Sequence, residues 1–162
     1  MVRAVVESGR DDIAHYTGND DNNIVDLLAQ WRFQAKGRVV ARQIVGGLLG
    51  HWAIWTKRAA ELLAEIKEAK EKWLLENSWL SRAVAVTDSN AVLFDPANQF
   101  HGCIPGIHEV LRRQGLMQNI LCIKPHETLS QGQSEELDRI YRAYPFLHDD
   151  EWVQANRDTW LR

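Results

Sequence analysis

The chain has 162 residues, of which 45% are hydrophobic and 25% are charged, which is the balance of one ordinary globular domain. Its formal net charge is −3 and its basic residues are scattered, which argues against nucleic acid or an anionic membrane as a partner. No apolar run reaches the roughly 18–20 residues of a membrane span, and no secretion signal follows Met1. We therefore expect a cytoplasmic protein whose two cysteines, Cys103 and Cys122, are reduced.

The first third of the chain alternates between predicted helices and strands. A helix at residues 2–8 is followed by a strand within residues 12–17 and by the turn signal Gly18-Asn19-Asp20-Asp21-Asn22-Asn23. Apolar residues at helical spacing then predict a helix over residues 23–33: Ile24, Leu27, Leu28 and Trp31. The β-branched run at residues 39–45 predicts the next strand.

The remainder of the chain is predicted to be helical. An apolar stripe with lateral ion pairs predicts a helix over residues 56–70, and one or two helices should cover residues 73–94. Pro105 fits the first turn of a helix that ends before Gly115. A capping box at residues 130–133 precedes a helix that Pro145 ends, and Asp149 should cap the last helix. Two parallel strands cannot form a complete buried sheet, so this order indicates a piece of a larger α/β fold with a helical tail.

Several segments resemble the C-terminal part of the dihydrodipicolinate synthase / N-acetylneuraminate lyase family. Gly18-Asn19-Asp20-Asp21 resembles the turn after the seventh barrel strand, and Val45-Gly46-Gly47-Leu48-Leu49-Gly50-His51 resembles the eighth strand with its exit loop. Cys103-Ile104-Pro105-Gly106-Ile107-His108 is similar to the Asn-Pro-x-Pro segment that opens a helix of the C-terminal helical domain. The likeness runs from about Val2 to the end of the chain.

This resemblance implies a partial (β/α)8 barrel over residues 1–70, made of the seventh and eighth strand units, and a C-terminal helical domain over residues 71–162. Family members form a Schiff base between pyruvate, or a similar 2-oxo acid, and a lysine on the sixth strand, while a tyrosine on the fifth strand shuttles protons. Neither residue has a counterpart here, because the likeness starts just after the sixth strand. We therefore expect no catalytic residue, no cofactor and no lyase chemistry from this chain alone.

Five residues are candidates for contact with substrate in a complete barrel. The resemblance places Gly18, Asp20, Gly46, Gly47 and His51 at the mouth of the pocket. Each has a simpler interpretation: Asp20 and Asp21 are expected to cap the following helix, and His51 would pack beside Trp52 and Trp55. For His51 the two interpretations stay open.

The sequence gives little support for a Schiff-base lysine or a metal site. The lysines lie on a polar helix face, at a helix start or in loops rather than at strand ends: Lys36, Lys57, Lys67, Lys70, Lys72 and Lys124. The histidines and cysteines after residue 100 fit no common zinc spacing, so no metal site is predicted.

Three hypotheses remain. The chain is a truncated relative of a Schiff-base lyase, or a non-catalytic interaction module that forms a homo-oligomer through its strand edges and tryptophan-rich helix faces, or a portion of a longer active lyase.

Overall fold

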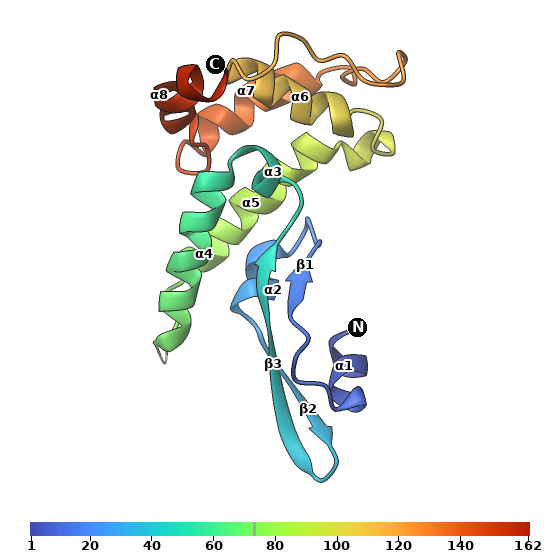
Figure 1. Cartoon of the computed structure of the whole chain (residues 1–162), viewed down its shortest axis with the longest axis vertical. Coiled ribbons are helices and arrows are strands. Elements are labelled where there is room, and N and C mark those ends of the chain that lie inside the picture. Colours follow the sequence, from blue (N-terminus) through green and yellow to red (C-terminus); the bar gives the residue numbers. More distant parts are fainter. Residues whose placement is uncertain (73) are drawn as a thin grey trace.

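The computed structural model describes residues 1–72 and 74–162, so Trp73, at the start of one predicted helical segment, lies outside the described residues. The chain combines a small sheet with a larger helical part, and more than half of its residues are helical. Figure 1 shows an elongated molecule with a β-hairpin at one end and the C-terminal helices at the other. This confirms the prediction of a mostly helical α/β fold.

The first three elements match the sequence in order. Helix α1 (Val2–Ser8) ends at Gly9, and strand β1 (His15–Thr17) is shorter than the segment predicted for it. Helix α2 (Asn23–Leu28) buries Ile24 and Leu27, the apolar residues that predicted it.

The prediction of one helix over residues 23–33 is wrong. The backbone leaves the helix at Ala29, which is extended (φ −67°, ψ 142°), and strand β2 (Gln30–Ala35) follows. A two-residue turn at Lys36 and Gly37 returns the chain into strand β3 (Arg38–Gly47), which confirms the strand predicted at residues 39–45. Both turn residues have positive φ, 50° and 75°, as the tight hairpin turns with left-handed residues require.

The sheet is mixed, and its two pairings use different parts of β3. Strand β2 pairs antiparallel with residues 38–43 of β3, from Gln30 opposite Gln43 to Ala35 opposite Arg38. Strand β1 pairs in parallel with the last part of β3, where Tyr16 lies opposite Gly46 and Thr17 opposite Gly47. The sheet order is therefore β1-β3-β2.

Three helices follow β3. The single turn α3 (His51–Ile54) leads into α4 (Thr56–Glu71), as the apolar stripe predicted, and α4 buries Ala59, Leu62, Ile66 and Ala69. Helix α5 (Ser78–Phe94) ends at Asp95, whose φ is 56°. None of the helices in the described ranges is both long and apolar enough to cross a membrane.

Four elements follow α5: the short 3-10 helix η1 (Pro96–Asn98), α6 (Cys103–Arg113), α7 (Gln133–Ala143) and α8 (Asp150–Trp160). A polar cluster joins the end of α5 to the starts of α6 and α7. The Asp95 carboxylate accepts hydrogen bonds from the Ser130 hydroxyl (2.6 Å) and the Gly102 N–H (3.0 Å). The Gln133 side chain accepts from the Ser130 N–H and donates to the Gly102 carbonyl. Of the two hydrogen bonds of the predicted capping box, only the one from the Ser130 N–H to the Gln133 side chain forms. The Ser130 hydroxyl donates to Asp95 instead.

One hydrophobic core connects the two ends of the chain. Its cluster of buried residues runs from Ile24 in α2 to Leu147 before α8, and Trp55, Leu93 and Leu137 are among its fully buried members. The domain boundary between residues 70 and 71 stays a prediction.

Candidate functional site

The five predicted site residues come from one end of the parallel strand pair. Because β1 and β3 run in the same direction in register, the turn after Thr17 and the exit after Gly47 lie at the same edge of the sheet. Gly18 and Asp20 belong to the turn, while Gly46, Gly47 and His51 belong to the end of β3 and the start of α3.

The turn from residue 18 to 22 is fixed by a side chain that the sequence analysis did not single out. Asn19 Oδ1 accepts hydrogen bonds from the backbone N–H groups of Asp21 (3.1 Å) and Asn22 (3.2 Å). No side-chain bond caps the start of α2, so the prediction that Asp20 and Asp21 cap this helix is wrong. Asn19 stands two and three residues before these amides, which is the spacing of a side chain that closes a turn, and it takes the N–H groups of Asp21 and Asn22.

A second residue that the sequence analysis missed connects the turn to the exit loop. Asn90 of α5 is 1% exposed, accepts a hydrogen bond from the His51 N–H (3.1 Å) and donates one to the Asp20 carbonyl (3.2 Å). Gly50, with φ 61°, packs against the same amide, and a Cβ there would collide with Asn90 Oδ1. An asparagine in the middle of an otherwise apolar helix face was the available signal, since a buried amide must find hydrogen-bond partners.

The two strand glycines make room for aromatic rings. A Cβ on Gly46 would lie 2.6 Å from the ring of Tyr16, and one on Gly47 would collide with the indole of Trp52. The Trp52 indole N–H also donates to Asn23 Oδ1 at 3.3 Å. In this structure Gly46 and Gly47 therefore allow close packing of side chains rather than the approach of a ligand to the backbone.

His51 is buried beneath the exit loop. Its side chain is 1% exposed, its ring lies 5.4 Å from the ring of Trp52, and neither ring nitrogen has a hydrogen-bond partner. Burial lowers the pKa of His51 to about 4, so the imidazole is neutral near pH 7. The packing interpretation therefore describes the position of His51, and the ring faces away from solvent.

Two of the five predicted residues border an open recess of about 270 Å³. Gly18 and Asp20 line it together with Asp21, Asn90 and Phe94, and further lining residues are Asn19, Ala91, Pro96 and Phe100. Burial and the neighbouring Asp21 raise the pKa of the Asp20 carboxyl. This wall offers carboxyl groups and backbone polar groups to a small polar ligand, and its lining contains no hydroxyl, thiol, amine, guanidinium or imidazole group.

Lysines are absent from the lining of this recess, but Lys36 directly follows β2, so the prediction that no lysine stands at a strand end is wrong for this residue. Burial and the nearby Lys67 lower the pKa of Lys70, whose amine donates to the Leu27 carbonyl at the end of α2 (2.9 Å). This contact stabilises a helix C-terminus and holds the amine away from the strand ends. Lys57 pairs with Glu61 on α4, and Lys124 lies 3.7 Å from Glu127 in a loop.

The described part of the chain contains no cluster of side chains that could bind a metal ion. Within residues 1–72 and 74–162, no group of three or more His, Cys, Asp or Glu side chains is placed to hold an ion. Cys122 Sγ lies 3.8 Å from His108 Nδ1, and burial followed by the Glu127 charge raises the pKa of this thiol. A protonated thiol beside one imidazole is a packing contact rather than a reactive pair.

Comparisons with protein-family models, with known proteins and with solved structures found no match to this chain.

Proposed function

We propose that this chain is the C-terminal portion of a (β/α)8 barrel of the dihydrodipicolinate synthase / N-acetylneuraminate lyase type, and that it completes a Schiff-base lyase rather than acting as one alone. In this proposal β1 and β3 are the last two barrel strands, α4 is the helix after the final strand, and the helices from α5 onward form the C-terminal domain. The β2–β3 hairpin is an addition to the strand–helix alternation.

The observation that carries the proposal is the parallel pair with two open edges. Within the described residues, β1 hydrogen-bonds to β3 alone, and residues 44–47 of β3 pair with β1 alone. Parallel strands are found almost only in larger sheets whose edges and faces are covered, and closing a barrel removes both edges. Tyr16 (58% exposed) and Val45 (41% exposed) leave apolar surface on these strands that adjoining strands would bury.

The position of the polar residues also supports a barrel. Active sites of such barrels lie at the carboxyl ends of the strands, and here the turn carrying Gly18 and Asp20 lies beside the exit loop of β3 at that end. This chain would thus contribute one wall of the pocket, with Asp20 as its polar group. A small 2-oxo acid such as pyruvate would be the substrate, and the reactive lysine would have to come from the strands that this chain does not contain.

Fragment complementation tests the proposal. The purified chain is mixed with the first six strands of a dihydrodipicolinate synthase, and amide hydrogen exchange is followed at residues 15–17 and 44–47. We expect rapid exchange in the chain alone and protection in the mixture, because new ladders would cover the open edges. Borohydride treatment with pyruvate should then add mass to the six-strand fragment and not to this chain.

A matched pair of proline variants controls for nonspecific association. Val45→Pro alters the parallel segment, whereas Val39→Pro alters the hairpin, and both side chains are exposed. Capture of the fragment should be lost in the first variant and retained in the second. Absence of protection with the unaltered chain, or a pyruvate adduct on the chain by itself, would contradict the proposal.

A further inference from the structure

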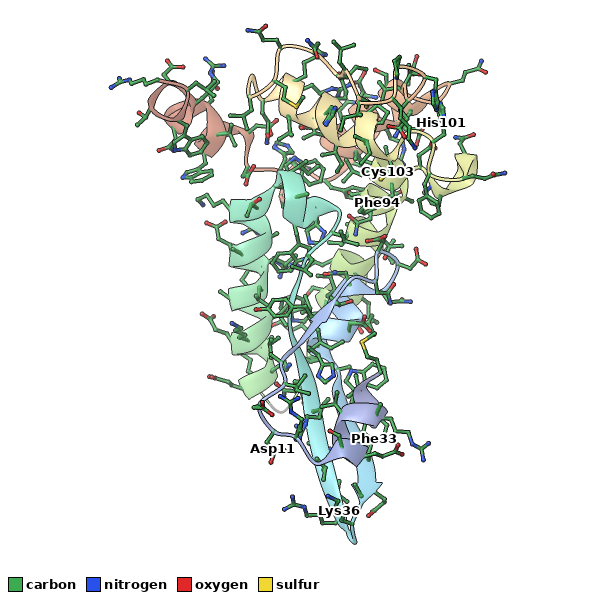
Figure 2. The ribbon with its side chains drawn as sticks, turned by 45° about the vertical axis from the view of Figure 1, so that its right-hand side comes forward. Asp11, Phe33, Lys36, Phe94, His101 and Cys103 are labelled. Atoms are coloured by element: carbon green, nitrogen blue, oxygen red, sulfur yellow. The ribbon has the colours of Figure 1, made fainter. Side chains whose placement is uncertain are left out.

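The β2–β3 hairpin gathers positive charge that appears scattered in the sequence. Residues 30–43 contain four basic side chains, Arg32, Lys36, Arg38 and Arg42, and no acidic one, although the whole chain has a net charge of −3. We call this segment the basic arm. Lys36 and Arg38 flank Gly37 at its tip, and Figure 2 labels Lys36 at the far end of the molecule.

The charges of the basic arm differ in how they are held. Arg42, near the base, pairs with Asp11, whereas Arg32 and Arg38 are exposed and have no ion-pair partner among the described residues. Lys36 is also exposed and outside any ion pair of the described residues, but its amine lies against Gly9 at the end of α1. Helix α1 packs against the arm, but Gln34 and Val39 near the tip remain exposed. An isolated two-stranded ribbon is marginally stable in water, so a partner that covers it would also stabilise it.

A recess of the opposite charge lies on the helical part. It has a volume of about 480 Å³, and its lining includes the carboxylates of Asp88, Asp95, Glu135 and Glu136 with one basic residue, Arg139. We call it the acidic groove. Arg139 is held by Asp88 (2.7 Å) and Glu136 (2.7 Å), so the lining keeps an excess of negative charge over small apolar residues, Ala91 and Val92.

The basic arm and the acidic groove cannot meet within one molecule. Lys36 lies at one end of the long axis, while His101, which follows η1 beside the groove, lies at the opposite end (Figure 2). Two complementary surfaces at opposite ends of one chain have the geometry of a head-to-tail contact, in which each surface would meet the other on a second copy.

We propose that the basic arm of one copy binds in the acidic groove of a second copy, with the Lys36–Arg38 tip beside Glu135 and Glu136. The contact is heterologous, so it builds a closed ring or an open filament rather than a twofold dimer. Pairing of two arms through their β2 edges is disfavoured because it brings like charges together. The groove is favoured over a polyanion such as DNA because it offers acidic side chains and an apolar floor in one recess of limited size.

Charge reversal in trans tests this contact with the full 162-residue chain. The tip variant is K36E/R38E and the groove variant is E135K/E136K. The control K67E/K72E makes the same charge change as the tip variant, at exposed positions of α4 and just after its end. Association is measured by sedimentation velocity at several protein concentrations, after circular dichroism has verified folding. Wild type and control should associate equally, and each reversal should weaken association about tenfold, as expected for two surface ion pairs.

The decisive sample is an equimolar mixture of the tip and groove variants. Each copy then presents one surface that matches the other variant, so association should return in the mixture, and 0.5 M NaCl should weaken it again. The proposal is overturned by a monomeric wild-type chain, by reversals that act no differently from the control, or by a mixture that fails to associate. Binding of the arm to a DNA duplex with no effect of the groove variant would likewise overturn it.

Discussion

His51 and Asn90 are neighbouring buried polar residues, but their hydrogen bonding differs. Asn90 donates to one buried backbone group and accepts from another, so its burial is compensated. His51 has both ring nitrogens buried without a partner, which costs about 1–3 kcal/mol for an unsatisfied group. Of these two residues, the asparagine therefore stabilises the junction of the strand ends and the histidine weakens it.

The His51 imidazole should make the fold acid-sensitive. Its pKa is about 4 in the folded chain and returns to its ordinary value near 6.5 on unfolding, so the unfolded chain binds the proton first as the pH falls. The stability contribution is complete above about pH 6.5 and decreases towards pH 4, by about 3 kcal/mol at most. His51→Leu should remove this loss, and urea unfolding at pH 7.5, 5.5 and 4.5 measures it. Equal pH dependence of both proteins would contradict the assignment.

Replacing Asn90 should separate the turn from the exit loop. In Asn90→Leu the buried His51 N–H and the partly buried Asp20 carbonyl both lose their side-chain partner, which predicts a loss of about 1–3 kcal/mol in the free energy of unfolding. Asn77→Leu is the control, because Asn77 is exposed and makes no side-chain cap on α5. Denaturant titration compares them, and similar midpoints for the two variants would show that Asn90 does not hold this junction.

At the scale of elements, the sequence predicts those helices whose apolar residues recur along their whole length. The stripes of α4 and α7 end in the core as expected, with Ile66 and Ile140 each 1% exposed. Asp149 stands at the predicted N-cap of α8, yet its carboxylate accepts the Lys57 N–H of α4 at 3.0 Å. Local spacing thus locates a cap, whereas the tertiary fold decides which helix the side chain serves.

The β2–β3 hairpin was missed in the sequence analysis because β2 directly follows α2 and its first apolar residue continues the helical spacing. Trp31 extends the helical spacing of Leu27 and Leu28, but in the structure Trp31 and Phe33 lie on a strand that pairs with β3. Alternation of apolar residues before Lys36-Gly37 was the signal for a strand and a tight turn. The charge of the basic arm was visible in the sequence, since residues 30–43 carry four basic side chains and no acidic one, but it was overlooked because this segment was divided between a predicted helix and a predicted strand.

A role of the strand-end residues in substrate contact stays a prediction, and the residue that supports them was missed. Gly18 and Asp20 line a recess, whereas the His51 N–H is held by Asn90 of α5, almost forty residues further along the chain. A contact of this separation leaves no periodic trace in one sequence, so Asn90 could be noticed as an unusual helix residue but not placed.

At the scale of the whole molecule, the sheet end and the helical end share one core. The buried cluster includes Leu27 of α2, Trp55 before α4, Leu93 of α5 and Leu137 of α7. The Asp149 carboxylate adds a polar link, since it also accepts a hydrogen bond from Gln114, the residue directly after α6 (3.3 Å). Because one core spans both parts, residues 1–70 and residues 71–162 should unfold together, since neither part keeps its buried surface without the other.

Unfolding of the chain should therefore be a single cooperative transition. Tryptophan fluorescence reports Trp55 and Trp79 in the core, far-UV circular dichroism reports all helices, and the two denaturation curves should coincide. Leu93→Ala, at a fully buried position of α5, should shift both curves equally and lower the free energy of unfolding by about 2–5 kcal/mol. Leu80→Ala on the same helix, where the side chain is 64% exposed, should change it by about 0.5 kcal/mol or less. Two separate transitions, or a shift of one curve alone in Leu93→Ala, would mean that the ends fold independently and that the boundary near residue 70 divides two domains.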